Sequence, residues 1–377
     1  MDSSSSFVPF PFASTLQSPH PQSYYAPPSR DSLPLDLGHG YNSTSFVQKT
    51  AKENLDNLVK SVLVTPNASN LLATNPVHVC TWRGILTKIA TAPYLNIPSQ
   101  GDRNNRPSDP PFELVAAIKN KVLYIHEAPP CITSNENSNH DSNASLSSSK
   151  SNEAYRTKPV SGVDPSYFGY KFENLATVPM DPSTVDPRIL SSYMDYRNDV
   201  PVDPISQHCT VFTASLGPLR LLYGAEMDAT VPKTPSRKSY QVELKTSTRP
   251  KHFRQIEIFT NTKLLKFYFQ SFFAGIPEII VGYRSKNLLT DIERIRVLDI
   301  PKTFNVTWDY RVCLGFVKWF LEMVIGRVKE EAEKDGVAFR VRIHEGIVSI
   351  WKESRAETMD RGVKMGREEV VGTHCFP

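Results

Sequence analysis

Two short triplets contain the residues of this chain whose types and spacing could do chemistry. They are Glu226-Met-Asp228 and Glu243-Leu-Lys245, which lie in the segments LRLLYGAEMDAT and SYQVELKTS. Both segments read as β-strands, and side chains two positions apart on a strand point to the same face. The intervening VPKTPSRK contains two prolines and is typical of a turn. The sequence therefore predicts a hairpin that brings three carboxylates and one ammonium group together.

A cluster of three negative charges is costly unless a cation neutralises it. Carboxylate oxygens are the ligands that hard divalent ions prefer. The order acid-x-acid followed by acid-x-Lys therefore favours phosphodiester chemistry that depends on Mg²⁺, or on Mn²⁺ in its place. The alternative is a set of solvated charges on an exposed sheet face. Apolar residues around both triplets favour the metal site over that alternative.

A strongly apolar segment, NTKLLKFYFQSFFAGIP, follows the second triplet. It predicts a helix that ends at Gly275 and Pro277. Lys266 and Gln270 are four residues apart and would share one face of this helix. The run IIVGYR after it predicts a buried strand.

Two residues upstream could also contribute to a site. In CTWRGILTKIATAPY, Arg83 lies at a predicted strand-to-helix transition, where its guanidinium and nearby helix amides could hold a phosphate. In FGYKFENLAT, Tyr170 and Phe172 alternate as in a strand, which places Glu173 on a strand. Structural roles stay open for both residues, because Arg83 could pair with a core carboxylate and Glu173 could cap a turn.

Five motifs occur in a fixed order: WRG at 82–84, GYKFE at 169–173, EMD at 226–228, ELK at 243–245 and K-x-x-x-Q at 266–270. Together they resemble the DXO/Rai-type family of RNA decapping and 5′-end pyrophosphohydrolase nucleases, in its fungal, nuclear branch. The resemblance runs from about YYAPP (24–28) and LDLGHGY (35–41) to IIVGYR (279–284), and more loosely through the last helix and strands. Each motif alone is weak, whereas five in order are specific.

The resemblance implies roles for particular residues. The metal ligands would be Glu173, Asp228, Glu243 and the backbone carbonyl of Leu244, with Glu226 binding directly or through water. The residues implied at the RNA 5′ end are Trp82, Arg83, Gly84, Glu226, Lys245 and Gln270, with weaker matches at Cys209 and Glu53. Catalysis would depend on Glu226, Asp228, Glu243 and Lys245.

The implied activity is metal-assisted hydrolysis at RNA 5′ ends. Substrates would be RNAs with a 5′ triphosphate, an unmethylated or incomplete cap, or a NAD cap, and whether 5′→3′ digestion follows stays open. The metal would polarise the phosphate and activate a water, while Arg83 and Lys245 would offset developing charge. One alternative is a protein that mainly binds and activates a nuclear 5′→3′ exoribonuclease. Another is a DNA nuclease, which GYKFE and the Lys266/Gln270 helix disfavour.

The N-terminal segment departs from the family pattern. The first 23 residues contain no Arg or Lys, where family members usually have an arginine near the substrate. Recognition of the cap by this segment is therefore in doubt, unless a residue such as Arg30 replaces that arginine. A nuclear location is implied by the resemblance alone.

The composition sets broad limits on the class of protein. A chain of 377 residues with 40% hydrophobic residues can bury one large core or two modest ones. The net charge of +4 does not by itself indicate nucleic-acid binding, but Lys and Arg dominate residues 233–254, where Glu243 is the sole acid. The five cysteines contain no C-x-x-C pair, which makes zinc binding and secretion unexpected. The sequence shows no signal peptide and no apolar run of the ~18 residues that a membrane span needs.

We expect an α+β fold in which a mixed sheet, or two packed sheets, is flanked by helices within one domain. A Ser/Pro-rich, disordered segment at 1–32 would precede a catalytic domain at 33–353, with a disordered insertion at 131–153 and a charged tail at 354–377. Residues 311–335 predict an amphipathic helix, and two strands would pair around Glu345-Gly346. The predicted inward positions of that helix are Val312, Leu314, Phe316, Trp319, Phe320, Met323 and Val324.

Overall fold

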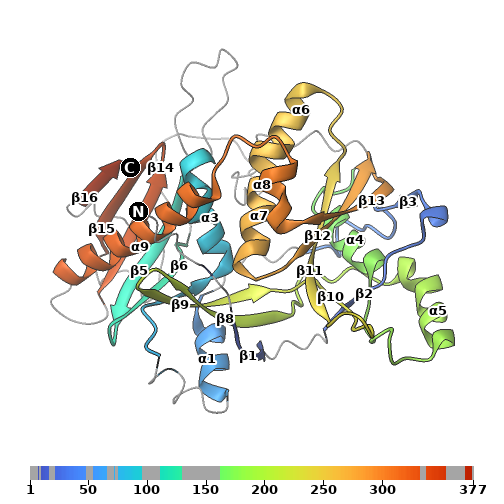
Figure 1. Cartoon of the computed structure of the whole chain (residues 1–377), viewed down its shortest axis with the longest axis horizontal. Helices are drawn as coiled ribbons and strands as arrows, with labels where there is room; N and C mark the ends of the chain where they lie inside the picture. Colours follow the sequence, from blue (N-terminus) through green and yellow to red (C-terminus); the bar gives the residue numbers. More distant parts are fainter. Residues whose placement is uncertain are drawn as a thin grey trace, which may run out of the picture.

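A computed structural model describes residues 7, 10–16, 22–47, 54–65, 72, 75–95, 111–129, 162–331, 337–353 and 370–375. Its described strands form two mixed sheets flanked by helices, in one domain (Figure 1). This confirms the α+β prediction in its two-sheet form. The predicted insertion at 131–153 and Glu53 lie outside the described residues.

The first sheet, sheet A, has the strand order β1-β8-β9-β4-β6-β5-β14-β15-β16. The bounds of its strands are β1 Phe10–Leu16, β4 Val79–Trp82, β5 Phe112–Lys119, β6 Val122–Glu127, β8 Cys209–Leu216, β9 Leu219–Glu226, β14 Ala338–His344, β15 Ile347–Lys352 and β16 Val370–Cys375. Strands β14 and β15 pair antiparallel around Glu345-Gly346, as predicted.

The second sheet, sheet B, has the order β3-β13-β12-β11-β10-β2-β7. The bounds of its strands are β2 Tyr24–Tyr25, β3 Leu35–Asp36, β7 Thr177–Val178, β10 Ala229–Val231, β11 Tyr240–Thr248, β12 Glu278–Ser285 and β13 Leu288–Arg296. Strand β12 is the predicted IIVGYR strand, and its side chains are buried from Glu278 to Tyr283.

Helices cover the faces of both sheets. Their bounds are α1 Asp56–Val64, α3 Arg83–Leu95, α4 Tyr167–Ala176, α5 Pro187–Tyr196, α6 Phe253–Ile258, α7 Leu264–Phe273, α8 Ile300–Thr303 and α9 Tyr310–Glu331, with short 3₁₀ turns at Arg30–Ser32, Arg197–Asp199 and Val297–Asp299 and a π-helical turn, η4, at Phe259–Lys263. None of the helices in the described part of the chain is long and apolar enough to cross a membrane.

The two sheets share their largest core. Helices α3, α7 and α9 bury apolar side chains in it together with residues of both sheets, such as Val79 of β4 and Ile279 of β12. Helix α4 packs on the other face of sheet B, where Phe172 contacts the cluster that includes Leu244. Helix α1 packs with the opposite face of sheet A through Leu58. Each sheet is therefore packed against helices on both of its faces.

Several predicted elements differ from the structure. FGYKFENLAT is helix α4 and not a strand, because its buried residues recur at helical spacing and pack on sheet B. The predicted 311–335 helix is α9, described from Tyr310 to Glu331, and its predicted end lies outside the described residues. Val312, predicted to point inward, is 50% exposed because it lies on the outer face of α9. The other predicted inward residues of α9 lie in or against the shared core.

Regular structure also occurs outside the predicted catalytic domain. Residues 1–32 contain β1, which extends the edge of sheet A beside β8, and β2, which pairs with β10 and β7. Strand β16 lies in the predicted charged tail and pairs with β15. Among the described strands, β1 and β16 are thus the two edges of sheet A, whereas β2 lies inside sheet B between β10 and β7.

Candidate active site

The candidate site lies where the chain passes from sheet A to sheet B. Strand β9 ends at Glu226, and β10 begins at Ala229. Between them, the backbone N–H of Met227 donates to the carbonyl of His208 over 2.8 Å. The predicted hairpin is therefore only β10 with β11, joined by a turn in which Thr234 and Arg237 form a bridge. The first predicted strand is two strands, so Glu226 and Asp228 do not share the face of one strand.

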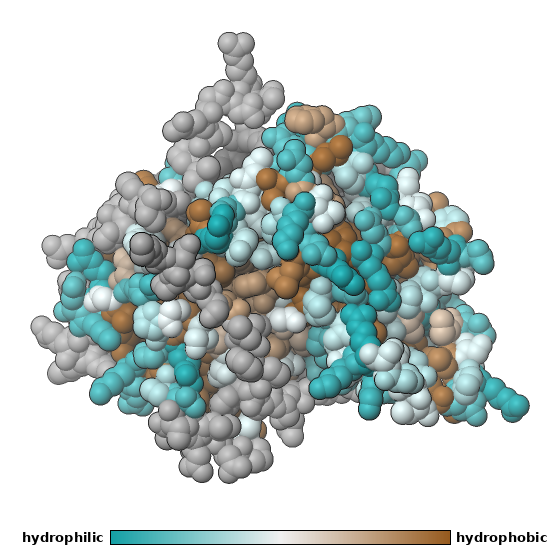
Figure 2. Space-filling model, viewed as in Figure 1, coloured by the Kyte–Doolittle hydropathy of each residue, from teal (hydrophilic) through white to brown (hydrophobic). Residues whose placement is uncertain are grey.

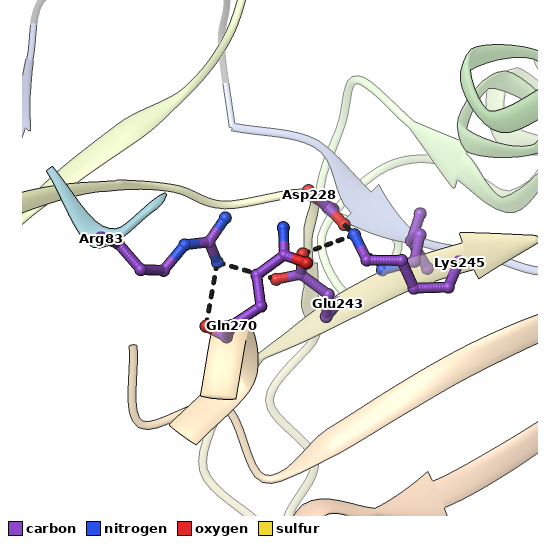
Figure 3. Close-up of polar contacts among 6 residues, drawn as sticks. Arg83, Asp228, Glu243, Lys245 and Gln270 are labelled. Carbon is purple, nitrogen blue, oxygen red and sulfur yellow. Dashed lines mark hydrogen bonds and ion pairs between the residues drawn. The ribbon is translucent and has the colours of Figure 1, made fainter. Parts of the chain in front are cut away.

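Glu243 is the centre of the polar contacts in this site (Figure 3). Its side chain is fully buried in the middle of β11. Arg83 Nη1 donates to its Oε2 over 3.0 Å, and Lys245 Nζ donates to its Oε1 over 2.6 Å. Two cations therefore engage the two oxygens of one buried carboxylate, which is the arrangement that makes a buried charge tolerable.

Asp228 lies beside this pair. Its Oδ2 accepts a hydrogen bond of 2.7 Å from the backbone N–H of Leu244 and lies 3.9 Å from Lys245 Nζ. The amide of Leu244 thus orients the Asp228 carboxylate. The role predicted for Leu244 concerned its carbonyl as a metal ligand, and it stays a prediction. In an extended strand the N–H and C=O of one residue face the same side, so this carbonyl is on the Asp228 side of β11.

Glu173 reaches the same cluster from α4. Its charge interacts with those of Asp228, Glu226 and Lys245. Tyr170, one helical turn earlier, interacts with Glu226 and Glu173. Because residues three apart share a helix face, the helical form of GYKFE turns Tyr170 and Glu173 toward the site together. The strand predicted for GYKFE did not reveal Tyr170, since a strand would have paired Glu173 with Lys171 instead.

The pKa values of the acids separate into two groups. Burial and the neighbouring carboxylates raise the pKa of Glu173 well above its usual value, and burial and Glu243 raise the pKa of Asp228 to about 7. Burial would also raise the pKa of Glu243, but Arg83 and Lys245 outweigh it and the pKa is lowered. Glu243 in turn raises the pKa of Lys245 despite burial. The site thus contains one firmly ionised acid, Glu243, between two cations. It also contains two acids, Glu173 and Asp228, whose ionised forms an additional positive charge would stabilise.

Arg83 is the first residue of α3, directly after β4, as the sequence predicted. Besides Glu243, its Nη1 donates to the backbone carbonyl of Gln270 over 3.2 Å. The open structural alternative for Arg83, a pair with a core carboxylate, is therefore present, and its partner is itself a predicted metal ligand. Gln270 contributes a carbonyl to this contact, whereas the prediction concerned its side-chain amide.

Trp82 and Gly84 flank Arg83 in different surroundings. The indole of Trp82 donates to the carbonyl of Asn54 over 3.0 Å and lies over Gly224, where an added Cβ would be 2.2 Å from the ring. Gly224 is therefore needed for the position of Trp82. Gly84 is exposed, with no atom within 4 Å of an added Cβ. An open backbone at the start of a helix is compatible with the predicted phosphate contact.

Cys209 and Lys266 are the other predicted residues that lie in the described part of the chain. Cys209 is the direct cross-strand partner of Glu226 in the β8–β9 pair and is partly exposed, so it lies beside the carboxylates as its spacing suggested. Lys266 is exposed on α7, one turn before Gln270. The functional roles of all these residues stay predictions.

The donor set bears on whether a metal would fit. Glu173, Glu226, Asp228 and Glu243 offer only oxygen atoms, which suits a hard divalent ion. Within the described residues, no three His, Cys, Asp or Glu side chains are already arranged as a ligand set. Lys245 and Arg83 instead balance the charge of Glu243. The chemistry of the residues fits a divalent ion, and binding would require Lys245 to give up its contact with Glu243.

Comparisons with known proteins identify the family. A family model described as RAI1 like PD-(D/E)XK nuclease matches residues 16–366. The chain belongs to this nuclease family. The decapping nuclease RAI1 of Neurospora crassa is 30% identical over 318 residues, which cover 82% of this chain and 68% of that protein. The decapping nuclease RAI1 of Aspergillus fumigatus is 30% identical over 358 residues, covering 89% and 84%.

Solved structures share the fold. Scheffersomyces stipitis Rai1, in complex with (3′-NADP)⁺ and calcium ion, matches with a TM-score of 0.68 at 19% identity and covers 93% of this chain and 91% of that one. Candida albicans Rai1, in complex with pU5 and Mn²⁺, matches with a TM-score of 0.63 at 21% identity, covering 88% and 84%. The family predicted from the five motifs is thereby confirmed, and so is the two-sheet form of the predicted α+β fold.

Proposed function

We propose that this protein is a metal-dependent decapping nuclease that hydrolyses RNA at its 5′ end. The observation that carries the proposal is the buried Glu243, held between Arg83 and Lys245 and surrounded by Asp228, Glu226 and Glu173, in a chain of the RAI1-like nuclease family. A binding surface alone has no physical need for four carboxylates around one point, because their mutual repulsion destabilises it.

The carboxylates, Arg83 and Lys245 have different roles in this proposed reaction. A divalent ion held by the four carboxylates, Mg²⁺ by preference, would supply polarisation of the scissile phosphate and activation of a water. Arg83 fixes the side chain of Glu243 through Oε2. The other oxygen, Oε1, contacts Lys245 and could bind the divalent ion in place of that ammonium group. Lys245 is a displaceable ammonium group, and once released from Glu243 it can orient the attacking water or offset charge on the phosphate.

The ligands of two relatives support, by analogy, the range of 5′ ends that we expect this protein to accept. The Candida albicans and Scheffersomyces stipitis proteins were solved with pU5 and with (3′-NADP)⁺, and these ligands combine phosphate groups with a nucleotide. We therefore expect this protein to remove pyrophosphate from 5′-triphosphate RNA and to release incomplete or NAD caps. Each product would be an RNA with a 5′ monophosphate.

The direct test uses RNAs that are identical except for the 5′ end. Wild-type protein with Mg²⁺ is incubated with triphosphate, unmethylated-cap, NAD-cap and monophosphate RNAs, and the products are resolved. Release of pyrophosphate or an intact cap, abolished in Asp228→Asn, is the expected result. If wild-type protein leaves all four RNAs unchanged with both Mg²⁺ and Mn²⁺, the proposal is wrong.

A nuclear location and binding to a 5′→3′ exoribonuclease are further proposals that rest on the resemblance to the fungal branch. Their test is separate from catalysis. Asp228→Asn replaces one ligand with a near-isostere, so it should still bind and stabilise such an exonuclease. Loss of both binding and hydrolysis in a folded Asp228→Asn protein would mean that the two functions share one surface.

A further inference from the structure

Helix α6 extends out of the core at the end of the strand and helix that form the site. Strand β11, with Glu243 and Lys245, leads to it, and α7, with Gln270, returns from it (Figure 1). None of the six residues of α6 is buried. Burial begins only at Phe259, in the π-helical turn η4 that joins α6 to α7. Packing in the core therefore does not explain this extension.

Two large apolar side chains are exposed on α6. Phe253 is 83% exposed, more than any other large apolar side chain in the described part of the chain, and Ile256 is 45% exposed three residues later. Figure 2 shows a hydrophobic spot over α6, at the top of the molecule, among hydrophilic neighbours. A single exposed aromatic ring is common on protein surfaces, so a binding surface is indicated here only by its combination with neighbouring cations.

Two cations lie beside Phe253. Lys251 and Arg254 are exposed on either side of it in the chain, and the acid Glu257 is exposed one residue beyond Ile256. The start of the helix is also fixed, since the Gln255 side chain accepts a hydrogen bond of 2.9 Å from the backbone N–H of Lys251. Arg249 does not belong to this group, because it pairs with Asp291 and Glu293 and stacks on Tyr283.

We propose that the surface formed by Lys251, Phe253, Arg254 and Ile256 binds the body of a single-stranded RNA whose 5′ end occupies the candidate site. Aromatic rings that stack on bases, with cations that contact phosphates, are how proteins hold single strands without reading sequence. The proposal rests on the function proposed above and adds where the rest of the RNA lies. Lys266, exposed on α7 between α6 and Gln270, marks the path between the two sites.

Because the surface and the candidate site are far apart, the contribution of the surface to RNA affinity should depend on the length of the RNA. Seventeen residues separate Phe253 from Gln270 in a nearly continuous helical segment, which corresponds to about 25 Å at about 1.5 Å per residue. A short RNA in the site cannot reach α6, whereas a long one can. The surface should therefore contribute affinity for long RNAs only.

The experiment measures binding by fluorescence anisotropy without divalent ions, so that hydrolysis does not intervene. A dinucleotide and a long unstructured RNA, both with 5′ monophosphates, are compared in wild type, Phe253→Ala, Phe253→Trp and Phe253→Leu. Phe253→Ala should weaken the long RNA about fivefold or more, which is the lower range for one base stack. Binding of the dinucleotide should not change, Phe253→Trp should bind the long RNA like wild type, and Phe253→Leu should be weakened like Phe253→Ala.

Charge is tested separately with matched controls. Lys251→Ala combined with Arg254→Ala should lower the slope of long-RNA affinity against salt concentration, on logarithmic scales, by about 0.7 for each phosphate that is no longer neutralised. Tyr196→Ala on α5 and Lys60→Ala on α1 remove an exposed aromatic and an exposed cation from other parts of the molecule, and both should bind like wild type.

Several outcomes would overturn the inference. It fails if Phe253→Ala binds long RNA like wild type, if Phe253→Leu does so, or if the dinucleotide and the long RNA weaken equally. Failure of the proposed function is distinct, since it would appear as inactive wild-type protein toward every 5′ end. A protein that binds long RNA through Phe253 without hydrolysing it would support the surface and reject the catalytic proposal.

Discussion

Arg83 Nη1 and Glu243 Oε2 lie 3.0 Å apart, with side chains that are 6% and 0% exposed. The two residues are 160 positions apart in the chain. Arg83 comes from the first turn of α3 and Glu243 from the middle of β11, so their contact joins sheet A to sheet B at the site. Breaking a buried pair leaves an uncompensated charge, which typically costs about 3–5 kcal/mol. In this site Lys245 also contacts Glu243, which reduces that cost.

Replacing Arg83 with lysine should therefore be damaging although the charge is kept. The hydrogen bonds of Arg83 to Glu243 and to the carbonyl of Gln270 both come from Nη1, which leaves the rest of the guanidinium for a phosphate. A single ammonium cannot hold these partners and a phosphate in the same planar arrangement. We expect kcat/KM to fall by a factor that corresponds to about 1.5–3 kcal/mol, the scale of a charge-assisted hydrogen bond. Urea unfolding of the same variant separates the two roles of Arg83. A loss of stability with unchanged kcat/KM would make it a structural ion-pair residue only.

The sequence predicted the elements of the site better than their contacts. Strand β11, helix α7 and the β4–α3 transition carry local patterns that packing does not override. The chain crossing at Asp228 has no such signal, because LRLLYGAEMDAT is continuously strand-like and only the tertiary fold assigns its two halves to different sheets. For the same reason, no local pattern could reveal that Arg83 pairs with Glu243.

The position of Glu173 shows a different limit. Tyr170 and Phe172 are good strand formers, and their alternation predicted a strand in GYKFE. In the structure the apolar face of α4 packs on sheet B through Phe168, Phe172 and Leu175, and this burial decides in favour of helix. The helical spacing of those three residues was the available signal, and it also identifies Tyr170 as a neighbour of Glu173.

Two glycine substitutions next to the site should have opposite effects on stability. Gly224→Ala places a Cβ 2.2 Å from the Trp82 ring, and overpacking of this kind costs about 1–3 kcal/mol. Gly84→Ala meets no atom within 4 Å and lies at the second position of α3, so it should stabilise the protein by less than the value of about 1 kcal/mol expected in a helix interior. Thermal unfolding checks both values. Full hydrolytic activity in Gly84→Ala would show that the phosphate does not occupy the space of the added Cβ, since alanine keeps the backbone N–H.

Removing two of the clustered acids should separate catalysis from folding. Glu226→Ala with Asp228→Ala should lower hydrolysis by more than about a hundredfold, because loss of outer partners alone lowers metal affinity or activity 10–100-fold. Stability should be unchanged or higher, since clustered carboxylates repel one another. The measurements are product release with Mg²⁺ and the melting temperature without it. Activity near wild type in this double variant would show that the site is wrongly placed.

The raised pKa values predict how stability depends on pH in the absence of a metal. The pKa of Asp228 rises to about 7 from 3.8 because of burial and Glu243, and that of Glu173 shifts in the same direction. An acid whose pKa is raised on folding stabilises the protein below its unfolded pKa, and this contribution is lost as the pH rises through its folded pKa. Glu243 has a lowered pKa, so its contribution is lost only on acidification below about 4.5. As the pH rises through about 7, ionisation of Asp228 therefore lowers the free energy of unfolding, and ionisation of Glu173 acts in the same direction.

A divalent ion should reverse this loss, because it binds the ionised carboxylates and releases their protons. We expect Mg²⁺ or Mn²⁺ to raise the melting temperature more at pH 8 than at pH 6, with about 2.7 kcal/mol of stabilisation at a hundred times Kd. Asp228→Asn is the matched control, since it keeps the shape of the side chain and removes the titrating group. Thermal unfolding of both proteins at several pH values, with and without the ion, isolates the contribution of Asp228. Equal pH slopes and equal ion effects in the two proteins would contradict the placement of Asp228 in a metal-binding cluster.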